Sequence, residues 1–160
     1  MITHKNITDV YKTKVETFPI TMEAAMEVAS NLLPDDYREV VEGHGYDPVE
    51  QLAFEAENGS SEYFTIPDGK TAVMGLAGVG DDGCIWMLCT PAIYEHPIAF
   101  VKKAKNYVNS RPEPLLWNVV DARNKVHIRL LRFLGFKFLR KISFGPNQLS
   151  FIEFCRVRRE

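Results

Sequence analysis

The sequence predicts a single α+β domain with a mixed, mostly antiparallel central sheet. Two observations predict it. The N-terminal third has helical apolar spacing and helix caps, whereas short apolar runs and tight turns begin near residue 61. The chain has 160 residues, which suits one domain spanning 1–160, and it contains no repeat and no Pro/Gly/Ser-rich linker.

Helices are expected in the first third. Thr21 is a favourable N-cap for the first of them, and Pro34 suits the first position of the second. His44-Gly45 should end the second helix, because glycine readily takes the left-handed conformation at a helix end. The expected elements are a short strand over 15–18 and helices over 21–32, 34–44 and 48–58.

Three strands joined by tight turns should follow, over 61–66, 71–79 and 84–90, as an antiparallel meander. The rest should form a β-α-β-α-β-β half when the last meander strand is counted first: a helix over 97–109, a strand over 115–121, a helix over 124–134, and a hairpin of 136–142 with 148–155. The helix over 97–109 connects two strands, so these strands should lie parallel.

Charge is divided unevenly along the chain. Residues 1–100 hold five Lys/Arg against 17 Asp/Glu, a net −12, whereas residues 101–160 hold 14 against four, a net +10. The basic half could meet a nucleotide-type cofactor or the acidic half of another copy, as in a homodimer, or the two halves could cancel within one fold. Basic and aromatic residues are not interleaved, so no nucleic-acid partner is expected. No apolar run is long enough for a membrane span, and a cytoplasmic protein is the expectation.

Three cysteines, Cys84, Cys89 and Cys155, argue against a disulfide framework. They are expected to be small buried apolar residues, with a catalytic thiol as the alternative. No Cys/His pattern has metal-ligand spacing.

The element order, together with Asn124-x-x-His127 and Gly135-Phe136, resembles the GNAT N-acetyltransferase superfamily. The chain is also similar, over nearly its whole length, to small phage and prophage proteins described as GNAT-like, among them an internal virion protein of short-tailed coliphages. That second resemblance rests on the runs Asp36-Tyr-Arg-Glu39, Gly45-x-Asp-Pro48, Trp86-Met-Leu-x-Thr90, Asn118-Val-Val-Asp-Ala-Arg-Asn124 and Gly145-Pro146.

The resemblance implies an acetyl-CoA site. The end of the central strand would pair with the pantetheine amides, and the start of the helix after it would hold the pyrophosphate. The segment at that helix start, 94–99, contains no glycine, Pro97 lacks an N–H, and Glu95 would repel phosphate. The expected cofactor residues are Leu88, Cys89, Thr90, Pro97, Ile98 and Asn124, with Asn124 alternatively a simple N-cap.

His127 is the candidate catalytic residue, because its imidazole titrates near neutrality. The alternative is a half-buried histidine that hydrogen-bonds neighbouring backbone. Leu131 stands where the resemblance would put a proton-donating tyrosine. His44 and Glu42 are candidate substrate contacts or plain surface residues.

Two functions follow. The first is a phage-encoded N-acyltransferase acting on acetyl-CoA and an amine acceptor in the bacterial host cytoplasm. The second is a GNAT-fold protein without cofactor, associated with a virion or bound to a host protein. The missing glycines and Leu131 motivate the second.

Overall fold

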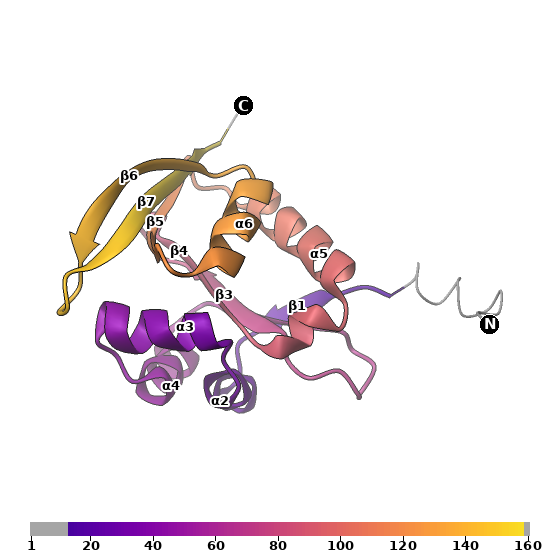
Figure 1. The fold of residues 1–160 in the computed structure, drawn as a ribbon. Helices are drawn as coiled ribbons and strands as arrows, with labels where there is room; N and C mark the ends of the chain where they lie inside the picture. The colour runs from indigo at the N-terminus through magenta and orange to yellow at the C-terminus, as the bar shows by residue number, and fades with distance from the viewer. Residues whose placement is uncertain (1–12, 159–160) are drawn as a thin grey trace, which may run out of the picture.

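The computed structural model describes residues 13–158 and follows the predicted order of elements (Figure 1). Two sheets and two groups of helices make up the fold. The strands are β1 Glu16–Pro19, β2 Glu62–Thr65, β3 Gly75–Val79, β4 Ile85–Cys89, β5 Leu115–Asp121, β6 Lys137–Phe144 and β7 Leu149–Val157. The helices are α2 Met22–Ser30, α3 Pro34–Arg38, the π-helical η1 Glu39–His44, α4 Pro48–Asn58, the 3₁₀ turn η2 Pro91–Tyr94, α5 Pro97–Ser110 and α6 Lys125–Phe133.

The first sheet is the predicted meander, in the order β1-β2-β3-β4 with every pair antiparallel. The expected strand over 71–79 is shorter, because β3 begins only at Gly75. The preceding residues are held in a turn by Asp68, whose carboxylate accepts the backbone N–H groups of Lys70 and Thr71 at 2.8 and 2.7 Å. Such an Asp turn competes with strand pairing.

The second sheet has the order β5-β7-β6, again antiparallel. A parallel bridge between Cys84 and Trp117 joins it to β4, which confirms that the strands on either side of α5 are parallel. The central sheet is therefore split into four and three strands that meet at one end of β4 and β5.

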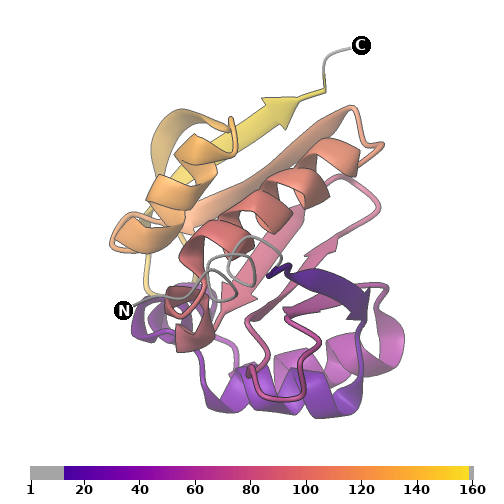
Figure 2. The same ribbon diagram turned by 90° about the vertical axis from the view of Figure 1, so that its right-hand side faces the viewer.

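Helices cover both faces. Figure 1 places α2, α3 and α4 together on one side of β3 and β4, and α5 and α6 on the other; in the turned view of Figure 2, α5 runs across the sheet. A smaller core lies under α2 and α4, with Val28, Leu52 and Leu76 at 1% exposure or less. The larger core lies under α5 and includes Phe64 and Phe100.

Helix starts agree with the predicted caps. Thr21 accepts the N–H of Ala24 at 3.1 Å, and Asn124 accepts that of His127 at 3.3 Å. The expected single helix over 34–44 is in fact α3 continued by the π-helical η1, which ends at Gly45 with φ +76°. Irregular π turns are frequent at functional sites.

The β6–β7 hairpin tip rests on η1. Asn147 Nδ2 donates to the backbone carbonyl of Glu42 at 3.0 Å, and a Cβ at Gly145 would lie 1.8 Å from the carbonyl oxygen of Gly43. No helix within residues 13–158 is long and apolar enough to cross a membrane.

Candidate functional site

The parallel strands β4 and β5 meet at their N-terminal ends. There the N–H of Trp117 donates to the carbonyl of Gly83 at 3.1 Å, and Asn118 Nδ2 donates to that of Ile85 at 2.7 Å. No further β-bridge between the two strands follows within the described chain. The strands thus have a gap between their C-terminal halves.

Two carboxylates occupy the far end of this gap. The N–H of Cys89, at the end of β4, donates to Oδ2 of Asp36 at 2.8 Å. The N–H of Asp121, at the end of β5, donates to Oε1 of Glu39 at 2.5 Å. Both acids lie one turn apart on the α3–η1 segment, which therefore closes the end of the gap with side chains.

A cavity of about 210 Å³ runs through the gap from η1 and α4 to α5 and α6. Its walls are mostly apolar, and titratable side chains of η1, α4, α5 and α6 also line it. The residues that line it include Glu39, His44, Glu55, Met87, Leu88, Tyr107, Val119, His127, Leu130 and Leu131.

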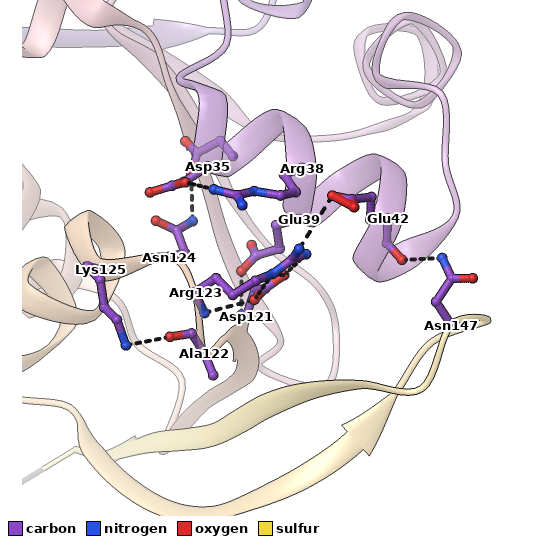
Figure 3. Close-up of polar contacts among 11 residues, drawn as sticks. Asp35, Arg38, Glu39, Glu42, Asp121, Ala122, Arg123, Asn124, Lys125 and Asn147 are labelled. Atoms are coloured by element: carbon purple, nitrogen blue, oxygen red, sulfur yellow. Dashed lines mark hydrogen bonds and ion pairs between the residues drawn. The ribbon is translucent and has the colours of Figure 1, made fainter.

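Three acidic side chains are buried at the η1 end of the cavity. Asp36 is 0% exposed, Asp121 2% and Glu39 9%. Arg123 makes a double contact with Asp121, with Nη2 at 2.8 Å from Oδ2, and its Nη1 lies 3.5 Å from Glu42 (Figure 3). Among the ion pairs of residues 13–158, the half-exposed guanidinium of Arg123 is the one cation that contacts Asp121, and Glu39 takes part in none.

These surroundings shift the pKa values of Glu39 and Asp121 in opposite directions. Burial raises the pKa of Glu39 from 4.5 to about 7, against the lowering effect of His127 and of the Asp121 N–H. Burial also raises the pKa of Asp121, but the hydrogen bonds and charge of Arg123 outweigh it and hold that pKa below its usual value. Glu39 is therefore the carboxyl at this site that can exchange a proton near neutral pH.

His127 is buried at 7% exposure and lines the cavity. Its Nε2 lies 3.4 Å from Oδ2 of Asp36 and has no hydrogen-bond partner. The ring nitrogen thus faces a carboxylate from another helix, where the alternative interpretation expected neighbouring backbone.

The three expected strand residues face different sides. Thr90 turns to β3, since its N–H donates to Met74 at 3.0 Å and its hydroxyl to Val73 at 2.7 Å. Leu88 is in register with Leu76 of β3 and also lines the cavity. Cys89 faces the gap, but its N–H is bonded to Asp36, as described above, and its carbonyl accepts the N–H of Leu33 at 2.9 Å.

Met87 is the strand residue that the sequence prediction missed. Backbone groups alternate in direction along a strand, and those of Ile85 and Cys89 point away from β3. Met87 lies between them in the same phase and lines the cavity. Its N–H and C=O therefore face the gap.

The start of α5 differs from a phosphate cradle. In the preceding turn, the N–H groups of Ala92, Ile93 and Glu95 are bonded within the turn, to Thr90 or Ala92. Pro97 opens the helix without an N–H, and Ile98 is 84% exposed. The N–H groups of Ile98 and Ala99 lie in the first turn of this 14-residue helix, at its positive end, where they can still meet an anion.

Asn124 acts as the N-cap of α6 and also donates from Nδ2 to Oδ1 of Asp36 at 2.9 Å. Its amide is 1% exposed. Both amide atoms are thus engaged within the protein. The two candidate substrate contacts, Glu42 and His44, lie in different surroundings. Glu42 pairs with Arg123, whereas His44 lines the cavity and stacks on Tyr46.

No protein-family model matches the chain, and no curated protein sequence matches it. Solved structures do. An acetyltransferase of the GNAT family from Bacillus cereus aligns with a TM-score of 0.64 at 9% identity, over 91% of this chain and 99% of that one.

Two similar structures were solved with a cofactor. The protein yncA of Salmonella typhimurium with its cofactor acetyl-CoA gives a TM-score of 0.59 at 13% identity, over 92% of this chain and 96% of that one. The aminoglycoside acetyltransferase AAC(6')-Ib with coenzyme A also gives 0.59, at 17% identity, over 91% and 95%. At this identity the likeness concerns the fold, and the chain has the fold of the GNAT acetyltransferases.

Proposed function

We propose that the protein is an acyl-CoA-dependent N-acyltransferase that moves an acetyl group from acetyl-CoA to an amine. The observation that carries this proposal is the apolar cavity through the gap between β4 and β5, with Glu39 at its wall. An elongated chain with amide groups fits such a gap, because the backbone of Met87 is turned into it.

Bound acetyl-CoA would supply the activated acetyl group. Met87 N–H and C=O would pair with pantetheine amides in the gap, beside the side chains of Leu88 and Val119. The first turn of α5 would meet the phosphates through its dipole alone. The walls of this gap would be held in place by the hydrogen bonds of Cys89, Thr90 and Asn124 described above.

Glu39 would accept the proton that the amine loses as its nitrogen attacks the thioester carbon. In that step a C–N bond would form and the C–S bond of the thioester would break, and the thiolate would take up a proton from solvent, since Leu131 has none to give. A general base works best when its pKa is near the working pH, and that of Glu39 is about 7. His127 lies at the same wall of the cavity, and His44 and Tyr46 would line the end that receives the amine.

The test is release of free thiol from acetyl-CoA with a panel of primary amines. Glu39→Gln should lower kcat by about 10²–10⁴-fold, the usual contribution of a general base. Glu42→Gln is the matched control, because Glu42 lies on the same helical turn and its exposed carboxylate pairs with Arg123 at the surface. Equal rates for wild type and Glu39→Gln would contradict this role of Glu39, and no thiol release with any amine would contradict the proposed activity.

A second function, favoured by specific observations, is a GNAT-fold protein that binds no cofactor. Both backbone groups of Cys89 are bonded within the protein, and the turn before Pro97 uses its own N–H groups. Such a protein would act in a virion or on a host factor, as its resemblance to phage and prophage proteins suggests. A phage origin is part of both proposals, and the bacterial host cytoplasm is the proposed location of the acyltransferase.

A further inference from the structure

Three side chains of metal-binding type converge behind the cavity wall, from three separate segments. Asp36 comes from α3, Cys89 from the end of β4 and His127 from α6, and one donor atom of each lies within 4.8 Å of the other two. Asp36 and Cys89 are 0% exposed and His127 is 7%. Burial of all three distinguishes the group from an ordinary surface cluster of acids.

The imidazole of His127 has a ring nitrogen without a partner. Its Nε2 is a buried polar atom without a hydrogen-bond partner, the one such side-chain atom found within residues 13–158. Buried polar atoms are normally satisfied, so this one calls for an explanation. Its distance of 3.4 Å to Oδ2 of Asp36 exceeds the usual 2.7–3.2 Å or so of an N–H···O bond. Two tetrahedral ligands with bonds of about 2.0 Å lie roughly 3.3 Å apart.

The carboxylate is already oriented by neutral donors. Oδ1 of Asp36 accepts Nδ2 of Asn124 at 2.9 Å, and Oδ2 accepts the N–H of Cys89 at 2.8 Å. Such outer hydrogen bonds commonly fix the ligands of metal sites. They leave the negative charge of a fully buried carboxylate without a permanent cation among these partners, which a metal ion would supply.

We propose that Asp36, Cys89 and His127 bind one Zn²⁺ ion. Thiolate, imidazole and carboxylate together suit zinc, whereas Mg²⁺ and Ca²⁺ prefer oxygen ligands alone. Three protein ligands leave a fourth position for water. The Cys89 thiol loses its proton to solvent as the Zn–S bond forms, so binding releases a proton. The ion ties the end of β4 to α3 and α6, whether or not the cavity binds acyl-CoA.

Cobalt(II) is the probe, because it takes the same tetrahedral sites and a thiolate ligand gives it an intense near-ultraviolet charge-transfer absorption. We expect EDTA-treated full-length protein to develop this absorption, saturating at one equivalent of Co²⁺, and Zn²⁺ to remove it. Cys89→Ser and His127→Gln should each lose the band or need at least tenfold more Co²⁺ to form it, in line with the effect of losing groups at a metal site.

The matched controls are Cys84→Ser and Cys155→Ser, since both thiols are half-buried and free but lie outside the cluster. Both should keep the full band. Circular dichroism identifies any variant that fails to fold. Asp36→Asn, nearly the same in shape as the wild type, is then used in place of that variant and should likewise lose the band or need at least tenfold more Co²⁺. No band in wild type, or a band that survives Cys89→Ser in folded protein, would overturn the proposal.

Discussion

Asn124 Nδ2 donates to Oδ1 of Asp36 at 2.9 Å and so joins α6 to α3 across 88 positions of sequence. The same amide caps α6 through its oxygen. A buried carboxylate and a helix start thus depend on one side chain. This contact also holds the end of the gap between β4 and β5, because Asp36 bonds in turn to the N–H of Cys89.

Asn124→Ala should lower the free energy of unfolding by about 2–4 kcal/mol. Loss of the cap accounts for about 1 kcal/mol, and the buried Oδ1 of Asp36, left without its donor, for about 1–3 kcal/mol. Urea denaturation measures the difference. Thr21→Ala is the control, since it removes only the cap of α2 and should cost about 1 kcal/mol. Equal losses in both variants would mean that the bond to Asp36 adds nothing.

Glu39→Gln should stabilise the protein above pH 7. The folded chain keeps the Glu39 proton up to about pH 7, whereas an unfolded chain loses it near 4.5, so stability falls as pH rises between these values. The difference corresponds to roughly 3 kcal/mol. Glutamine can still accept the N–H of Asp121 and carries no charge.

Denaturation of EDTA-treated protein at pH 5 and pH 8 checks this expectation. The gain from Glu39→Gln should be small at pH 5 and reach a few kcal/mol at pH 8. Glu42→Gln, at an exposed position, should show no such dependence. A gain that is the same at both pH values would contradict the assigned pKa of Glu39.

Gly83→Ala should weaken the junction of the two sheets. The glycine has φ +86°, and an added Cβ would lie 2.1 Å from the carbonyl oxygen of Leu115. The backbone must move next to the bridge between Cys84 and Trp117, which should cost more than the 1 kcal/mol or so of a left-handed alanine.

Gly69→Ala separates the two effects of Gly83→Ala. It has a similar φ of +72° but open space around the added Cβ, so it should cost only about 1 kcal/mol. Thermal unfolding of both variants provides the comparison. If Gly83→Ala lowers the stability no more than Gly69→Ala does, the contact of the added Cβ with Leu115 costs nothing, which would contradict this prediction.

Elements set by local signals were predictable. Thr21 and Asn124 cap the helices they were expected to cap, and β6 and β7 form the expected hairpin, with Gly145 at φ +78° in its turn. The parallel relation of β4 and β5 followed from the helix that connects them. These features depend on residues close together in sequence, where spacing carries the information.

The site was harder to predict, because its contacts link distant positions. Asp36 and Glu39 were named within a run that resembles phage proteins and were given no role at the site, but they bond to Cys89 and Asp121, 53 and 82 positions away. The backbone direction of Met87 depends on which side of β4 pairs with β3. Nothing local marks either feature, so the sequence prediction named the neighbours of Met87 instead.

Isothermal titration with acetyl-CoA tests the central claim most directly. We expect micromolar binding for wild type, and at least tenfold weaker binding for Leu131→Trp, which fills the cavity from α6. Phe133→Trp, an exposed position on the same helix, should bind as wild type does. No heat of binding at millimolar acetyl-CoA, or equal affinities in all three proteins, would contradict a cofactor site between β4 and β5.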